Sequence, residues 1–151
     1  MEIVRELVAP ASPEVLFAYV GDLGEYPEWM PLIHAVEPRT PAPDGTPIWS
    51  VELRATVGPF ARSKRLRMRR STHVVDRLAV FERDEDDGRD HSPWILRAEL
   101  SPDPSGATTD PTTRLTMTMT YGGSLWAGPV LERVLDEQVR LGSDALLRLV
   151  S

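Results

Sequence analysis

Two amphipathic patterns follow one another in residues 115–150, LTMTMTYGGSLWAGPVLERVLDEQVRLGSDALLRLV. In the first, leucine, methionine and tyrosine alternate with threonine, which predicts a strand with one face on the core and the other in water. Gly122 and Gly123 end this strand, and apolar residues then recur at helical spacing from about Leu125 to Val150. A helix of that length spans roughly 35 Å, about the width of a small domain. Its apolar stripe comprises Trp126, Val130, Leu131, Val134, Leu135, Leu141, Ala145, Leu146 and Leu149.

Alternation of apolar and polar residues upstream of this segment predicts further strands, separated by loops rich in Pro, Asp and Gly. The predicted strands cover residues 2–9, 32–36, 48–56, 60–73, 74–83 and 94–100. Strands that follow one another through short loops are antiparallel neighbours, and strands this long must twist and curl. The pattern leaves the inward face undetermined in residues 2–9 and in 74–83.

Two short helices are expected after the first strand. Ser12 is a helix cap, Pro13 suits the first helical position and Glu14 favours the positive end of the helix dipole. Residues 25–30 form one further helical turn, which Pro31 closes. The prediction is an α+β fold, in which a curved antiparallel sheet of about seven strands wraps around the long C-terminal helix. A single domain, residues 1–151, is expected, with a gap between helix and sheet as the candidate site.

Composition excludes several classes of function. The sequence has 151 residues, 41% of them hydrophobic, and no cysteine, which rules out disulfides, cysteine-ligated zinc and thiol catalysis. A cytoplasmic location is the default expectation for such a chain. The net charge of −6 disfavours a nucleic-acid partner. No apolar run approaches the length of a membrane span.

A resemblance to a known family lies in residues 9–31, APASPEVLFAYVGDLGEYPEWMP. This segment resembles the opening of the START-like (SRPBCC) superfamily, in particular its polyketide cyclase/dehydrase and lipid-transport branch. The resemblance implies a helix-grip fold with a deep cavity between the last helix and the sheet. It also implies hydrophobic ligands such as lipids or polyketides. It does not imply catalysis, and it carries over no catalytic residue, so catalytic residues remain unknown.

Residues on the expected inward faces are the candidates for ligand contact, with a filled core as the alternative reading. Methionine and tryptophan on these faces suit an irregular cavity wall. Arg70 shares the parity of Leu66 and Met68, so an inward guanidinium is expected to anchor an acidic ligand group. The candidate set is Trp29, Met30, Trp49, Val51, Leu66, Met68, Arg70, Phe81, Trp94, Leu96, Met117, Met119, Trp126, Val130 and Val134.

Signals for chemistry are weak elsewhere. The histidines at positions 34, 73 and 91 match no metal-binding spacing, and the sequence has no nucleophile elbow or phosphate-binding loop. No metal or cofactor is therefore expected. The basic run at residues 62–70, which includes Lys64, is interpreted as an outer face or sheet edge that discourages aggregation.

Three functions stay open at this point. The first is a non-enzymatic carrier or sensor of a small hydrophobic molecule. The second is a polyketide cyclase or dehydratase, which would need titratable groups such as Arg70 with His73, Glu52 or Tyr121 to converge inside. The third is a protein-interaction module with a collapsed cavity. The ligand's identity, and whether the chain is a monomer or a homodimer, are also left open.

Overall fold

The computed structural model describes residues 1–57, 59–103, 112–122 and 129–151. The elements are β1 (Glu2–Ala9), α1 (Pro13–Val20), the 3-10 helix η1 (Leu23–Glu28), β2 (Ile33–Pro38), β3 (Ile48–Val57), β4 (Phe60–Val74), β5 (Leu78–Arg83), β6 (Trp94–Pro102), β7 (Thr113–Tyr121) and α2 (Pro129–Val150). Within these residues, seven strands form one antiparallel sheet in the order β1-β7-β6-β5-β4-β3-β2. The predicted fold class is confirmed.

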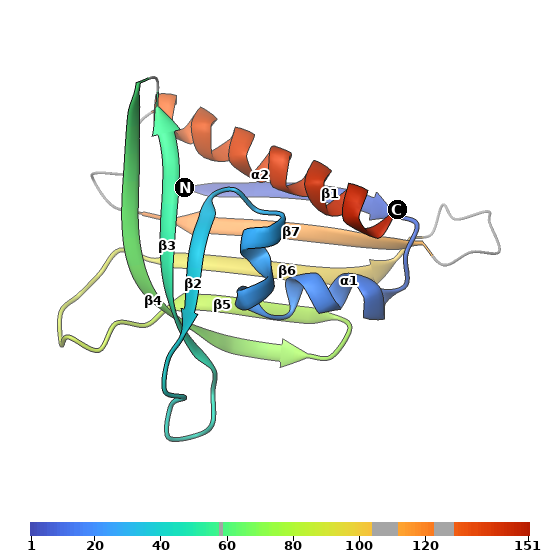
Figure 1. Ribbon diagram of the computed structural model, residues 1–151. Coiled ribbons are helices and arrows are strands. Elements are labelled where there is room, and N and C mark those ends of the chain that lie inside the picture. The colour runs from blue at the N-terminus through green and yellow to red at the C-terminus, as the bar shows by residue number, and fades with distance from the viewer. Residues whose placement is uncertain (58, 104–111, 123–128) are drawn as a thin grey trace.

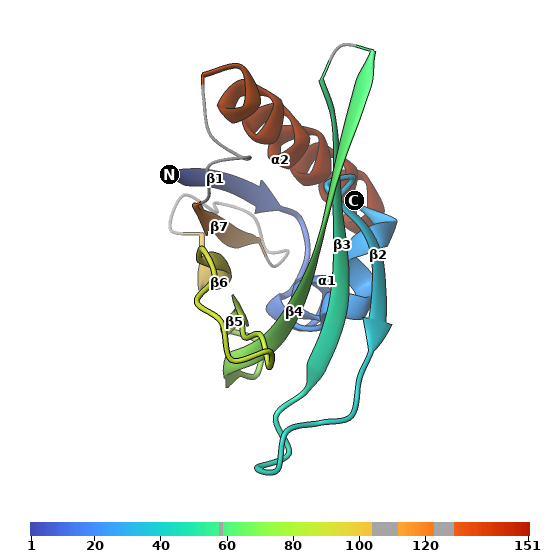
Figure 2. The same ribbon diagram turned by 90° about the vertical axis from the view of Figure 1, so that its left-hand side faces the viewer.

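The sheet bends sharply between its two halves. β1, β7, β6 and β5 run across the view in Figure 1, whereas β3 and the first part of β4 run vertically and the end of β4 turns across the view. The pairing of β4 with β5 shifts register between Arg70 and Thr72, and a bulge of this kind bends a strand and increases its twist. Figure 2 shows the result, a deeply curved sheet with α2 lying between its two arms.

The first short helix forms where its capping residue predicts, whereas the second, expected at residues 25–30, covers Leu23–Glu28. The Ser12 hydroxyl accepts a hydrogen bond from the Val15 N–H at 3.4 Å at the start of α1. The Asp22 carboxylate accepts one from the Gly24 N–H at 2.8 Å at the start of η1. These two caps fix the direction in which the chain leaves β1 and approaches β2.

One predicted strand boundary is wrong. Residues 74–83 were expected to be one strand, but Val74 ends β4, residues 75–77 form a turn and β5 begins at Leu78. Asp76 makes this turn in the left-handed conformation, with φ of 63°, and no glycine or proline announces it in the sequence. The undetermined face is also settled, because Ala79 and Phe81 are fully buried.

The concave face of the sheet carries the core. Along β7 the leucine, methionine and tyrosine side chains are buried and the intervening residues are half-buried, as the alternation predicted. In β1, Ile3 points inward while Val4 and Val8 are exposed. The core therefore lies inside the curve of the sheet, where the helices close it.

Helix α2 presents a narrower buried stripe than predicted. Leu135, Val139, Gly142 and Leu146 are buried at spacings of four, three and four residues. Leu141, predicted to belong to the stripe, is exposed. It directly precedes the buried Gly142, and a step of one residue turns the side chain about 100° around the helix axis. Leu149, also predicted for the stripe, is exposed as well. Residues 125–128 of the predicted helix lie outside the described residues.

Helix α2 closes the concave face by packing against β1 and β3. An ion pair between the Arg5 guanidinium and the Asp136 carboxylate, at 2.7 Å, joins β1 to the helix. No helix in the described part of the chain is both long and apolar enough to cross a membrane.

Candidate functional site

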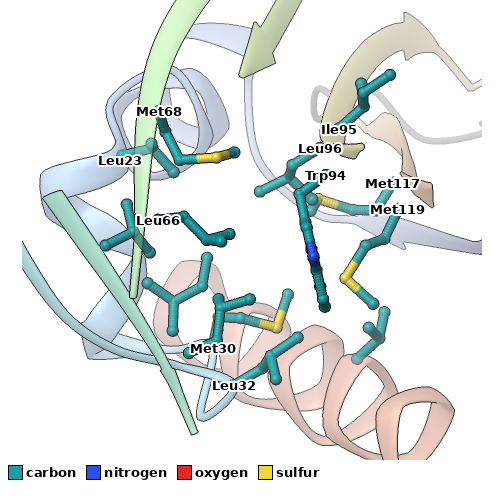
Figure 3. A pocket seen from close by; sticks show the side chains of 14 residues that line it. Leu23, Met30, Leu32, Leu66, Met68, Trp94, Ile95, Leu96, Met117 and Met119 are labelled. Carbon is teal, nitrogen blue, oxygen red and sulfur yellow. The ribbon is translucent and has the colours of Figure 1, made fainter. Parts of the chain in front are cut away.

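A cavity lies between the concave face of the sheet, the segment from η1 to β2, and α2. Figure 3 shows Leu23, Leu66 and Met68 on one side of it and Trp94, Met117 and Met119 on the other, with α2 beneath. Strand alternation explains most of the wall, since β3, β4 and β7 each direct every second side chain inward. β6 contributes the three consecutive residues Trp94, Ile95 and Leu96. Segments far apart in the sequence thus enclose one space.

Many of the residues that line the cavity were expected to contact a ligand. These predicted residues are Met30, Val51, Leu66, Met68, Trp94, Leu96, Met117 and Met119. The other lining residues, which are not among the predicted contacts, are Leu23, Leu32, Ile33, Leu53, Ile95 and Val139. Leu53 has the parity of Val51 in β3, so alternation alone was enough to find it. Val139 needed the phase of α2, which only tertiary packing fixes.

The cavity is narrow as it stands. The space between the lining atoms is about 550 Å³ including the part open to solvent, but the centre of a water-sized sphere has only about 30 Å³ of room. A ligand of ordinary drug size needs a pocket of about 300–1,000 Å³. Occupation by such a ligand therefore requires the lining side chains to move apart.

The lining is suited to such movement. Met30, Met68, Met117 and Met119 all border the space. Methionine has three rotatable side-chain bonds and a polarizable sulfur, so it refills irregular gaps at low cost. The methionine side chains therefore close the cavity in a way that an apolar guest can reverse.

Trp94 forms part of the cavity wall. Its ring stacks on the Tyr121 ring at 5.2 Å between centroids, with 26° between the planes. Burial raises the pKa of Tyr121, and the negative charge of Glu132 adds to the effect. The phenol next to the wall therefore stays neutral through the physiological pH range.

Three predicted ligand contacts lie instead in an aromatic cluster, which we define as Tyr26, Trp29, Trp49 and Phe81. The Tyr26 ring lies 4.7 Å from Trp29 and 5.8 Å from Phe81, and Phe81 lies 5.7 Å from Trp49. The Trp29 indole N–H donates to the Tyr19 carbonyl at 3.3 Å. Neither Trp29, Trp49 nor Phe81 is among the residues that line the cavity. Their packing against one another stabilises the position of η1, whose Leu23 lines the cavity.

Arg70 donates a hydrogen bond to a backbone carbonyl and is not among the residues that line the cavity. Its guanidinium Nη1 donates to the Gly21 carbonyl at 3.0 Å, at the C-terminal end of α1. Nearby, the His73 ring lies 5.4 Å from the Phe17 ring. Desolvation lowers the pKa of His73, and the positive charge of Arg70 lowers it further.

The remaining predicted contacts lie on α2 or before it. Val134 is half-buried and does not line the cavity. Trp126 lies outside the described residues, and so does the side chain of Val130.

Acid–base groups do not converge at this site in the part of the chain that the structure describes. Arg70 and His73 lie near the end of α1, whereas Tyr121 stacks on Trp94 at the cavity wall. Glu52 alternates with the lining residues Val51 and Leu53, so it points to the other face of β3. Among the described residues, no three His, Asp or Glu side chains gather in a way that would hold a metal ion. The described residues that line the cavity offer a ligand apolar contact.

Solved structures with this architecture come from several bacteria. A START superfamily protein of Mycobacterium smegmatis has a TM-score of 0.73 at 17% identity, over 99% of this chain and 96% of that chain. A Thermus thermophilus protein has a TM-score of 0.67 at 14% identity, over 99% and 97%. An aromatase/cyclase from a Streptomyces species has a TM-score of 0.64 at 15% identity, over 99% and 93%. At these identities the likeness establishes the fold alone.

Comparison with curated proteins finds no match to this chain. The family comparison is decisive, because the model described as polyketide cyclase/dehydrase and lipid transport matches residues 1–150. The START-like resemblance of residues 9–31 thus extends over nearly the whole sequence. The chain belongs to the polyketide cyclase/dehydrase and lipid transport family.

Proposed function

We propose that this protein binds a small hydrophobic molecule, of the lipid or polyketide kind, between α2 and the concave face of the sheet. The observation that carries the proposal is the uniformly apolar lining contributed by η1, the following segment, five strands and α2. Such a wall stabilises a guest by removing apolar surface from water, at about 25 cal/mol per Å².

Binding without turnover is the function that this lining favours. A cyclase or dehydratase steers proton transfer with titratable groups within hydrogen-bond reach of its substrate. The lining residues are Leu, Ile, Val, Met and Trp, which supply no acid or base. The family name includes both cyclases and lipid transport, and the chemistry of this cavity supports the transport side.

The test is a titration with N-phenyl-1-naphthylamine, a neutral apolar dye whose fluorescence rises out of water. We expect saturable binding to the wild type. Met117→Trp places a larger side chain in the cavity, so it should weaken binding by about tenfold, which is about 1.4 kcal/mol. Circular dichroism and thermal unfolding should show that this variant remains folded.

Thr118→Trp is the matched control. Thr118 is the next residue of β7, and alternation directs it to the other face of the sheet. This variant should bind the dye like the wild type. Absence of saturable binding to the wild type, or equal weakening by both tryptophans, would contradict the proposed function.

A further inference from the structure

The inward face of β4 carries a cation next to the cavity. Lys64, the only lysine in the sequence, has the same parity as the lining residues Leu66 and Met68. Its side chain is half-buried. Its Nζ atom lies 5.8 Å from the centre of the Trp94 ring, which lines the cavity. Lys64 therefore stands where the apolar lining meets a polar environment.

The polar environment is an ion pair at the end of β5. The Arg83 Nε lies 2.9 Å from the Glu85 Oε1, and their side chains are only 10% and 17% exposed. Glu85 Oε1 also accepts a hydrogen bond from the Arg67 backbone N–H at 3.1 Å. Arg83 additionally donates to the Ser92 carbonyl at 3.3 Å. The Glu85 carboxylate is thus already engaged by Arg83 and by the backbone.

The charges of this group do not balance. Lys64 and Arg83 are cations and Glu85 is a single carboxylate, so these three described groups together carry one net positive charge in a partly desolvated place. Desolvation lowers the pKa of Lys64, repulsion from Arg83 lowers it further, and attraction to Glu85 only opposes these effects. A ligand that brings a negative charge to this point would relieve the imbalance.

The strand arrangement gives such a ligand a way to reach Lys64. The pairing of β4 with β5 ends at Met68 and Arg83, and β4 continues beyond the end of β5, as Figure 1 shows. Lys64 lies in that continuation, two residues before Leu66. An apolar body against Leu66, Met68 and Trp94 would therefore place its head group near the ammonium.

We propose that Lys64 anchors the anionic group of an amphipathic ligand, such as a carboxylate, whose apolar body occupies the cavity against Trp94. This inference rests on the proposed function and narrows its ligand class. Lys64 supplies a point charge with three N–H donors at the edge of an apolar wall. The expected ligands have one anionic end and are otherwise apolar.

Two dyes that share an anilinonaphthalene framework test the proposal. 1-Anilinonaphthalene-8-sulfonate carries a negative charge, whereas N-phenyl-1-naphthylamine is neutral. Lys64→Gln should weaken binding of the sulfonate by roughly three- to tenfold, because it removes one charge-assisted contact, and leave the neutral dye unchanged. Lys64→Arg keeps the charge and should restore sulfonate binding.

Arg65→Gln is the matched control, because Arg65 is the next residue of β4 and is exposed on the other face. It should leave the affinities for both dyes unchanged. Equal effects of Lys64→Gln on both dyes, or an effect on neither, would overturn the anchor while the cavity stands. If the wild type binds neither dye, the proposed function fails and the anchor fails with it.

Discussion

Gly142 of α2 lies directly against Met30, at the point where the helix approaches the segment between η1 and β2. A Cβ atom at position 142 would come within 2.8 Å of the Met30 Sδ and 3.3 Å of the Met30 Cα. The sulfur can rotate away, but the Cα can yield only if the backbone shifts. Met30 lines the cavity, so Gly142 sets how closely the helix lies over it.

The first prediction concerns this close approach. In an isolated helix, Gly→Ala stabilises by about 1 kcal/mol. Here we expect Gly142→Ala to lower the free energy of unfolding by about 1–2 kcal/mol, because the new methyl group forces α2 away from Met30. Urea unfolding measures the change. Arg148→Ala, at an exposed position of the same helix, should stay within about 0.5 kcal/mol of the wild type. A Gly142→Ala protein more stable than the wild type would contradict the close approach.

The second prediction separates the aromatic cluster from the cavity. The Tyr26 hydroxyl donates to the Val20 carbonyl at 2.8 Å in a fully buried place, and burial raises the pKa of Tyr26. Tyr26→Phe leaves that carbonyl without its donor and should lower the free energy of unfolding by about 1–2 kcal/mol. Dye binding should not change, because Tyr26 does not line the cavity. Tyr19→Phe, at a half-buried tyrosine of α1, is the comparison. A loss of dye affinity in folded Tyr26→Phe would place the cluster inside the binding site.

The third prediction concerns His73. Its pKa is lowered from the usual 6.5 by desolvation and by the charge of Arg70, so the folded protein favours the neutral ring. The stabilisation that the neutral His73 ring contributes to the folded protein is therefore fully present above about pH 6.5. It is lost as the pH falls through the lowered pKa of His73 in the folded protein. An NMR titration should find the His73 pKa below 6.5 in the wild type and higher in Arg70→Gln. An unchanged pKa in that variant would remove Arg70 as a cause.

Alternation predicted the strand walls of the cavity well, since the face on which a strand residue lies depends on its immediate neighbours. Leu66, Met68, Met117 and Met119 were all found in this way. The phase of α2 was predicted less well, because Val139 faces the cavity only through the way the helix packs on the sheet. Leu141 shows the same limit, because its place in the apolar pattern predicts a core residue but its side chain is exposed.

Three large aromatic residues among the predicted ligand contacts lie outside the cavity lining. Trp29, Trp49 and Phe81 are buried, but they bury one another, and a sequence pattern does not separate a filled core from a cavity wall. Lys64 shows the opposite case. Its parity with Leu66 was available in the sequence, but Lys64 was interpreted together with the surrounding arginines as part of an outer face or sheet edge.

The methionines provide the most direct test of the central claim. Of the five in the sequence, Met30, Met68, Met117 and Met119 line the cavity, while Met1 is 52% exposed at the N-terminus. The protein labelled with ¹³C at the methionine methyl groups should be titrated with N-phenyl-1-naphthylamine and followed by NMR. An apolar guest between α2 and the sheet should shift the four cavity signals and leave the Met1 signal in place. Dye binding that leaves those four signals unmoved would show that the guest lies elsewhere.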